Sequence, residues 1–257
     1  MTFTIQNMEF YLMVLIRVSA FVMTAPFLSY RSIPIRVKAA ISVFLTIVVA
    51  QAVPEVSFSY GGVVGYAVLI LKEIIVGCVL GFMCSLCFYI VSFAGQFMDI
   101  EMGLSMASTF DPTSNMQVTI TSNIYNYFLM LTMVVTNMHY YIIRAIVDSF
   151  RYFNVGQAVI RSEGIKTLIV DFMGNYLLIA LRIVLPMFCC MLMLNVVLGV
   201  LTKAAPQMNM FVVGIQLKVM AGLIVLILMV QTFPTVFDFV FTEMKEVITE
   251  VVRGFSP

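Results

Sequence analysis

Residues 63–94 read VVGYAVLILKEIIVGCVLGFMCSLCFYIVSFA and form the longest apolar run of the chain. Lys72 and Glu73 are the only charged residues in this run. A helix of this length measures about 48 Å at 1.5 Å per residue, whereas the hydrocarbon core of a bilayer is about 30 Å thick. The run therefore predicts a membrane helix that overshoots the bilayer by more than tilting comfortably absorbs.

The whole chain has the composition of a membrane protein. Of its 257 residues, 62% are hydrophobic and 11% are charged, and the mean hydropathy is +1.06. A soluble domain carries about 25% charged residues, so a water-soluble globular protein is excluded. The 14 basic and 13 acidic residues leave a net charge of +1 without a basic patch, which argues against nucleic-acid binding.

Five further segments are apolar over lengths that reach or approach the roughly 17–25 residues of a membrane span. They are Phe10–Tyr30, Val37–Val53, Tyr125–Val147, Tyr176–Leu201 and Phe211–Phe233. From Pro234 onward, apolar and charged residues alternate at helical spacing, which is typical of an amphipathic helix lying on a membrane or a partner. We therefore expect an all-α fold of about six long apolar helices plus a C-terminal amphipathic helix, with a kink at Pro186.

Five charged residues lie inside the apolar runs: Arg17, Lys72, Glu73, Arg182 and Lys218. A lone charge in hydrocarbon is costly, so such side chains tend to face protein or water. One explanation is snorkelling or pairing within the chain, for example of Lys72 with a carboxylate on another helix. The other is that these helices pack against other subunits. We expect Lys72, Arg182 and Lys218 to face protein rather than lipid.

Signatures of enzymatic or metal chemistry are almost absent from the sequence. The single histidine, His139, has no second histidine to act with, and all five cysteines lie in apolar stretches. Asp99 and Glu101 form only a weak acid–base candidate, and no nucleotide-binding or metalloprotease motif occurs. We expect neither an enzyme nor a bound metal or cofactor. Gly77 and Gly81 form a G-x-x-x-G pattern, which permits close helix packing but is common.

A polar, methionine-rich stretch, Gly95–Asn123, follows the longest apolar run and contains no Lys or Arg. Within it Met98, Met102, Met106 and Phe110 recur every four residues. Methionine is flexible and polarizable, so these side chains can close around a variable object and open again. An ordinary re-entrant or amphipathic segment has the same composition. We expect a mobile loop whose flanks are kept wetted by three acidic residues: Asp99, Glu101 and Asp111.

Two blocks of this sequence match a known pattern. In the methionine-rich stretch the matching residues are Gly95, Gln96, Asp99, Gly103, Asp111 and Pro112. In a later block they are Asn195, Gly199, Lys203, Ala205, Pro206, Gln207, Asn209, Phe211, Gly214 and Gly222, which include the specific run A-P-Q-x-N-x-F-x-x-G. With these blocks the sequence resembles the FliR family of flagellar biosynthetic proteins and their type III secretion counterparts. Length and segment order agree as well, so the resemblance covers essentially the whole chain.

The resemblance implies a single export-gate domain over residues 1–257, with a FliP-like part (1–171) followed by a FliQ-like hairpin and amphipathic tail (172–257). It implies a non-enzymatic subunit that forms a closed pore with FliP-like and FliQ-like subunits in the bacterial inner membrane, at the flagellar basal body. FlhB-like and FlhA-like export components would lie beside this pore, and unfolded proteins would pass through it. The methionine-rich stretch would plug the pore, and the turn Lys203–Asn209 would contact a neighbouring component.

Two alternatives stay open. One is the virulence-type secretion homologue of the same family. The other is a small multi-pass transporter with a midplane substrate site near Arg182, Pro186 and Asn195, because transporters build such sites from broken helices that carry a charge.

Overall fold

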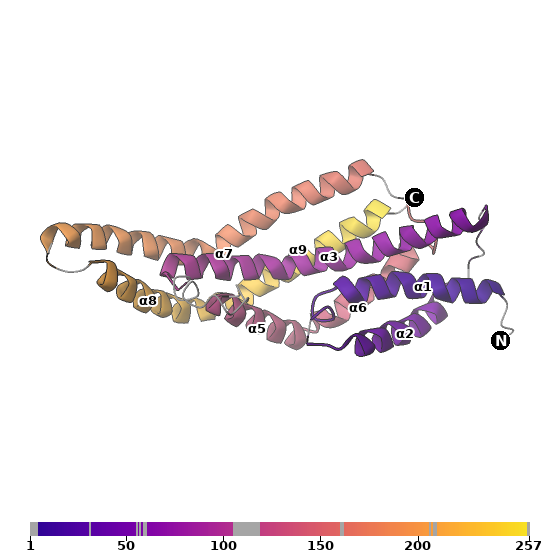
Figure 1. Cartoon of the computed structure of the whole chain (residues 1–257), viewed down its shortest axis with the longest axis horizontal. Coiled ribbons are helices and arrows are strands. Elements are labelled where there is room, and N and C mark those ends of the chain that lie inside the picture. Colours follow the sequence, from indigo (N-terminus) through magenta and orange to yellow (C-terminus); the bar gives the residue numbers. More distant parts are fainter. Residues whose placement is uncertain are drawn as a thin grey trace. The chain divides into compact units, whose positions relative to one another are not determined.

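The computed structural model describes residues 5–30, 32–54, 56, 58, 61–104, 119–159, 162–205, 207 and 210–255. Over these ranges the chain is helical and has no strand, which confirms the all-α prediction (Figure 1). The elements are α1 (Ile5–Thr24), α2 (Ile35–Ala52), α3 (Gly62–Met102), α5 (Ile120–Val135), α6 (Met138–Tyr152), α7 (Ser162–Ala204), α8 (Met210–Met229), the short 3₁₀ helix η1 (Val230–Thr232) and α9 (Phe233–Phe255).

The apolar segments account for the helices, because a chain in hydrocarbon must satisfy its backbone hydrogen bonds internally. Among the described residues, five helical stretches are long and apolar enough to cross a membrane. They are Asn7–Thr24, Ile35–Ala52, Gly62–Met102, Phe172–Ala204 and Val213–Phe255. The number rises to six if the bent pair α5 and α6 counts as one span, in agreement with the number expected from the sequence.

α3 extends beyond the apolar run that predicted it. It has 41 residues, about 62 Å, and continues past Ala94 to Met102. Gly103 follows with φ +80° and donates its N–H to the carbonyl oxygen of Ile100 at 3.1 Å, as a left-handed residue after a helix does. Residues 95–102, predicted to lie in a loop, are therefore helical.

The segment predicted as one helix, Tyr125–Val147, is broken in the structure. α5 ends at Val135 and α6 begins at Met138, and the two helices are bent by 73°. Asn137 lies at the break with φ +58°, in the left-handed region that asparagine tolerates better than most residues. α7 keeps Pro186 inside it and changes direction along its length (Figure 1), as expected for a proline that removes one helical hydrogen bond.

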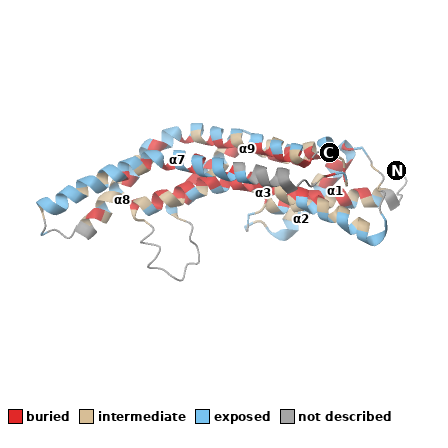
Figure 2. Cartoon of the chain, turned by 90° about the horizontal axis from the view of Figure 1, so that it is seen from above, coloured by how far each residue is buried: buried red, intermediate tan, exposed pale blue. Residues whose placement is uncertain are grey.

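The chain divides into two compact units, which we describe separately. Unit 1 comprises Met1–Cys87, Met133–Phe172 and Phe241–Pro257, and unit 2 comprises Phe88–Thr132 and Met173–Val240. In unit 1, α1 and α6 bury apolar side chains at helical spacing: Val14, Val18, Phe21, Ile142, Ile146 and Phe150. In unit 2, exposed positions, many of them apolar, follow one another along much of α7 and α8 (Figure 2).

The amphipathic C-terminal helix is present as α9, but its apolar face packs inside the chain. Phe233, Phe237 and Val240 are buried in unit 2. The rest of the stripe is buried in unit 1: Phe241, Met244, Val247, Ile248, Val251, Val252 and Phe255. The expectation that this face lies on a membrane or a partner is therefore wrong, because the chain itself supplies the surface that covers it.

Candidate functional site: a buried ion pair and the anchors of the methionine-rich segment

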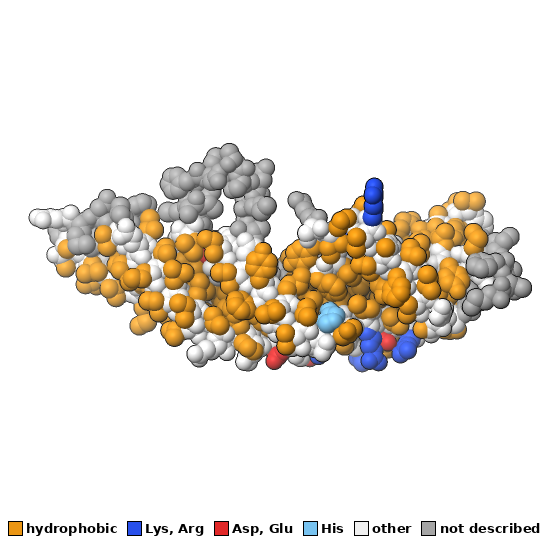
Figure 3. Space-filling view, turned by 90° about the horizontal axis from the view of Figure 1, so that it is seen from below, with side chains coloured by type: hydrophobic (Ala, Val, Ile, Leu, Met, Phe, Trp, Pro, Cys, Tyr) orange, Lys and Arg blue, Asp and Glu red, His pale blue; other side chains and the backbone are white. Residues whose placement is uncertain are grey.

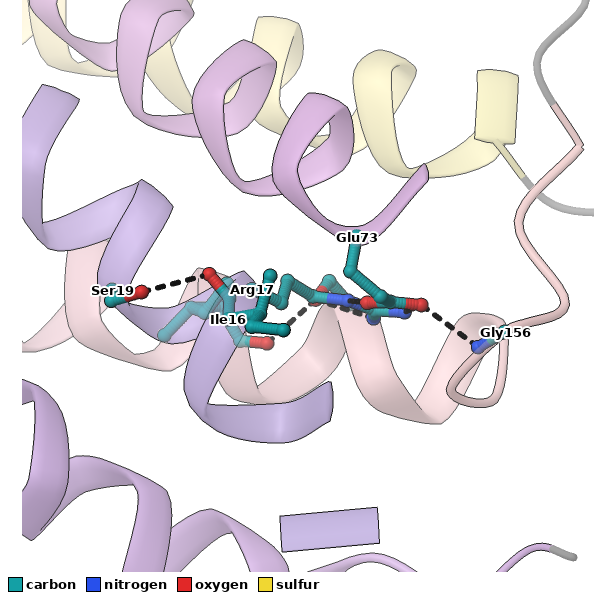
Figure 4. A network of polar contacts seen from close by, with 7 residues as sticks. Ile16, Arg17, Ser19, Glu73 and Gly156 are labelled. Atoms are coloured by element: carbon teal, nitrogen blue, oxygen red, sulfur yellow. Dashed lines mark hydrogen bonds and ion pairs between the residues drawn. The ribbon is translucent and has the colours of Figure 1, made fainter. Parts of the chain in front are cut away.

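Arg17 on α1 and Glu73 on α3 form an ion pair in the core of unit 1 (Figure 4). The Nε atom of Arg17 donates to Oε2 of Glu73 at 2.5 Å, and Nη2 donates to Oε1 at 3.1 Å. Both side chains are 0% exposed. This bidentate geometry suits the planar guanidinium and carboxylate groups and fixes their orientation.

The remaining polar atoms of the pair are used by residues around α6. Nη1 of Arg17 donates to Oγ of Ser149 at 3.3 Å, and the backbone N–H of Gly156 donates to Oε1 of Glu73 at 2.8 Å. The Cζ atom of Arg17 lies 4.0 Å from the ring centroid of Phe150 and 4.6 Å from that of Phe153, in cation–π distance of both. The pair therefore joins α1, α3, α6 and the turn after α6.

Two glycines of α3 bring α1 close enough for this pairing. A Cβ atom added at Gly77 would lie 2.3 Å from the carbonyl oxygen of Arg17, and one added at Gly81 would lie 2.1 Å from Oγ1 of Thr24. Glu73 lies one turn before Gly77, on the same side of α3. The prediction that the G-x-x-x-G pattern permits close packing is confirmed, and the close approach is what places Glu73 against Arg17.

The pairing of Lys72 with a carboxylate on another helix stays a prediction. Among the described residues Lys72 forms no salt bridge, and the carboxylate beside it in sequence, Glu73, pairs with Arg17 instead. Lys72 and Lys218 are half-buried, whereas Arg182 is exposed. That these three side chains face protein rather than lipid stays a prediction.

The start of the methionine-rich segment is anchored to α5 in unit 2. Asp99 is fully buried, and its carboxylate accepts the backbone N–H of Thr121 at 2.9 Å and the Thr121 hydroxyl at 2.5 Å. A negative charge beside the first N–H groups of α5 is favourable because those groups have no helical partner. The expectation that Asp99 keeps a loop wetted is therefore wrong, because this side chain caps a helix.

A second anchor lies one turn before Asp99. A Cβ atom added at Gly95 would lie 2.5 Å from Cα of Ser122, so α3 and α5 touch backbone to backbone at this point. Ser92 and Asn126 exchange a hydrogen bond nearby, with Nδ2 of Asn126 donating at 2.8 Å. These contacts join the end of α3 to the start of α5.

Of the four residues predicted to close a pore, the structure describes two. Met98 and Met102 are fully buried in unit 2, as side chains of the last turns of α3. Met102 packs against α8, where a Cβ atom added at Gly222 would lie 2.3 Å from its sulfur. The others, Met106 and Phe110, lie outside the described residues, as do Asp111 and Pro112 of the family pattern. Gln96 is half-buried on α3.

The second family block lies at the hairpin between α7 and α8. Lys203 is exposed in the last turn of α7, and the N–H of Ala205 donates to the carbonyl oxygen of Leu201 at 2.9 Å. Gln207 is exposed in the connection, while Pro206 and Asn209 lie outside the described residues. Phe211 and Gly214 belong to the first turns of α8.

The residues suggested for a transporter site are not brought together. Arg182 lines a groove of about 290 Å³ in unit 2 with Ile179 and Ile183 of α7 and with Thr235, Val236 and Phe239 of α9. Asn195 lies 13 residues further along α7, about 20 Å away, and does not line this groove. Within the described ranges no group of three or more metal-ligating side chains occurs.

Over its described residues the chain is all-α, with long apolar helices and buried polar groups that cap and join them, which fits a polytopic membrane protein. Comparison with known proteins shows its family. The chain belongs to the bacterial export proteins, family 1, whose model matches residues 8–244. Members of this family are export components and not enzymes.

Several relatives cover nearly the whole chain. The flagellar biosynthetic protein FliR of Escherichia coli (strain K12) is 28% identical over 250 residues, which are 95% of this chain and 93% of the relative. FliR of Bacillus subtilis (strain 168) is 29% identical over 222 residues, 84% of each chain. FliR of Buchnera aphidicola subsp. Acyrthosiphon pisum (strain APS) is 30% identical over 215 residues, 82% of this chain and 81% of the relative. The resemblance to FliR inferred from the sequence is confirmed.

Proposed function

We propose that this chain is a subunit of the flagellar type III protein export gate. It forms a closed pore with FliP-like and FliQ-like subunits in the bacterial inner membrane at the flagellar basal body, beside FlhB-like and FlhA-like components. Unfolded flagellar proteins pass through this pore. Support comes from the family match, from the names of the relatives, and above all from the length of the apolar surface that α3 leaves exposed.

Exposed apolar side chains follow α3 almost from end to end, from Val63 (86% exposed) to Ile100 (59% exposed). The positions between them include Val64, Val68, Leu71, Ile74, Ile75, Phe82, Tyr89 and Phe93. This surface is about 56 Å long. A straight helix would have to tilt by about 58° to fit it into a 30 Å hydrocarbon core, beyond the roughly 0–40° seen for membrane helices. Packing of other protein subunits against part of α3 would account for an apolar surface of this length.

Exposed apolar side chains are also found on other parts of the described surface. In the view of Figure 3, hydrophobic side chains cover most of the described surface and charged side chains gather at only a few places. On unit 2, the exposed apolar positions of α8 include Met220, Leu223, Ile224, Ile227 and Leu228. A membrane protein without partner subunits needs an exposed apolar surface only over the thickness of the hydrocarbon core.

Copurification tests the proposal directly. The tagged full chain is expressed together with the FliP-like and FliQ-like proteins of the same bacterium and extracted in mild detergent. It should elute with both of these small membrane proteins. Native mass spectrometry would give the composition, with an equally tagged unrelated polytopic protein as the control. A monomer or a homo-oligomer would support the transporter alternative and contradict the gate.

The export substrate separates the flagellar gate from the virulence-type homologue. Deleting the gene should abolish flagellin export and swimming, and the full chain should restore both. If the deletion abolishes secretion of other proteins while flagella form normally, the chain belongs to the virulence-type system.

We further propose that residues 1–171 are the FliP-like part and residues 172–257 the FliQ-like hairpin and tail. In this arrangement the turn Lys203–Asn209 contacts a neighbouring export component. A photo-cross-linker at the exposed position Gln207 should reach another subunit. Cross-links confined to the chain itself would contradict this contact.

The methionine-rich segment is proposed as the element that closes the pore. Met98 and Met102 form its packed base, Asp99 holds that base on α5, and Met106 and Phe110 are the closing side chains. Apolar, flexible side chains exclude water and ions from a narrow passage and part around an unfolded chain without breaking specific hydrogen bonds.

Deleting Ser105–Phe110 tests this closure. The complex should assemble and conduct ions, measurable as conductance in lipid bilayers or as growth inhibition on expression. A variant with the six residues replaced by glycine and serine controls for segment length and should leak as well. Normal assembly with unchanged ion tightness would contradict closure by this segment, and loss of assembly would show that it is a packing element instead.

A further inference from the structure

Arg182 occupies an unusual position on α7. It lies in the stretch Phe172–Ala204, which is apolar enough to cross a membrane, and its side chain is exposed. The groove it lines has an apolar floor, because Ile179 and Ile183 are 4% and 5% exposed. An arginine in such surroundings is costly unless an anionic group meets it.

Within the described part of the chain, none of the salt bridges supplies that anionic group to Arg182. Thr235 lines the same groove and brings a hydroxyl group. Pro186 lies four residues after Arg182 and has no N–H to donate to the Arg182 carbonyl oxygen. This carbonyl oxygen therefore lacks its helical hydrogen bond and adds a second polar group at this position of α7.

The flanking residues distinguish a protein carboxylate from a lipid phosphate. A phosphate headgroup marks the edge of the hydrocarbon, beyond which exposed residues should be polar. Exposed apolar side chains instead continue on both sides of Arg182. They are Met173, Leu177, Leu178 and Leu181 before it, and Leu185, Leu192 and Met193 after it. A headgroup at Arg182 would leave the first group in water, whereas an apolar helix with one acidic residue would cover both groups.

We propose that the groove around Arg182 is a docking site for an apolar helix of another subunit that carries one carboxylate. Arg182 binds this carboxylate, the Thr235 hydroxyl donates a second hydrogen bond, and the exposed leucines of α7 pack against the partner's apolar side chains. The inference rests on the proposed gate function and specifies the chemistry of one of its interfaces. The fully desolvated pair also fixes the register of the two helices, because a shift by one turn would leave both charges unpaired.

The test uses the full chain expressed with its FliP-like and FliQ-like neighbours. A photo-cross-linker at Leu178 or Phe239, which flank Arg182, should attach to one segment of another subunit that contains an aspartate or glutamate. Arg182→Gln should lower the recovered complex by at least about tenfold, and Arg182→Lys by less, because it keeps the charge. Arg144→Gln is the matched control, since Arg144 is an exposed arginine whose side chain is 71% accessible, and it should change nothing.

The decisive arm exchanges the charges. Arg182→Glu should abolish recovery of the complex, and arginine at the cross-linked acidic position of the partner should restore it to at least half. If the unaltered chain assembles but the cross-linker captures only phospholipid, or if Arg182→Gln assembles normally, the docking site is wrong while the gate proposal stands. If the unaltered chain recovers no other subunit, the proposed function itself fails.

Discussion

Two arginines of this chain lie within apolar helices and have opposite surroundings. Arg17 on α1 is fully buried and uses a carboxylate, a hydroxyl group and two aromatic rings, all from its own unit. Arg182 on α7 is exposed in a groove where the described residues offer no carboxylate. The first site is complete within its own unit, whereas the second is the place where we propose that another subunit binds.

Glycines of α3 and of α7 differ in a similar way. Gly77 and Gly81 of α3 lie against α1 with no room for a Cβ atom. Gly174 and Gly199 of α7 have no atom within 4 Å of the position that a Cβ would take. Small residues near Arg17 therefore serve packing within the chain, while the surface of α7 stays open. The comparison therefore separates a self-contained site around Arg17 from a surface of α7 at which we propose that another subunit assembles.

The largest expected effect comes from breaking the buried pair. Arg17→Met leaves the Glu73 carboxylate unpaired in the core, which should cost about 3–5 kcal/mol of the free energy of unfolding. The double variant Arg17→Met with Glu73→Leu should recover most of that loss, because no buried charge is left. Denaturant titration of the purified full chain in detergent measures both, with Arg144→Met as an exposed control. If the double variant loses as much free energy of unfolding as Arg17→Met and Glu73→Leu lose in total when measured singly, the pairing is contradicted.

A smaller effect is expected when α1 is pushed away from α3. Gly77→Ala places a Cβ atom against the carbonyl oxygen of Arg17, a backbone atom that moves only with its helix, so stability should fall by about 1–3 kcal/mol. Gly174→Ala is the matched control, since an alanine there meets nothing and gains up to about 1 kcal/mol from helix propensity. Equal effects of the two substitutions would show that α1 and α3 do not approach as described.

An effect of the same size as that of Gly77→Ala, but more local, is expected at Asp99. Asp99→Ala leaves the Thr121 N–H and hydroxyl without their acceptor, at a cost of about 1–3 kcal/mol. Asp99→Asn keeps one acceptor oxygen and should cost less. Faster hydrogen exchange of the Thr121 amide would report the lost cap locally, with Asp148→Asn on the surface of α6 as the control. Unchanged exchange in Asp99→Ala would contradict the capping role.

The sequence predicted the fold class and the membrane segments because apolar length is a direct requirement of the bilayer. It located Arg17 and Glu73 as costly charges but assigned no partner between them, since α1 and α3 meet only through the shape of their surfaces at Gly77 and Gly81. The α5–α6 bend was missed because Asn137, which takes the left-handed conformation, is not a strong helix breaker.

The capping role of Asp99 could not be predicted from the sequence. Its neighbours Gly95, Glu101 and Gly103 are typical of a loop, and the residue that it caps, Thr121, lies 22 residues away. Only the tertiary contact between α3 and α5 turns this exposed-looking carboxylate into a buried cap. Arg182 was recognised as an anomaly from sequence, but the groove formed with α9 required the structure.

The most direct test measures the two arginines side by side, in the isolated full chain and in the assembled complex. Arg17→Met should lower the free energy of unfolding of the isolated chain by about 3–5 kcal/mol. Arg182→Gln should leave that value within about 0.5 kcal/mol of the unaltered chain, because it is an exposed position, and should lower the recovered complex by at least about tenfold. If Arg182→Gln destabilises the isolated chain as much as Arg17→Met does, or assembles as well as the unaltered chain, the distinction between the self-contained and the assembling region is contradicted.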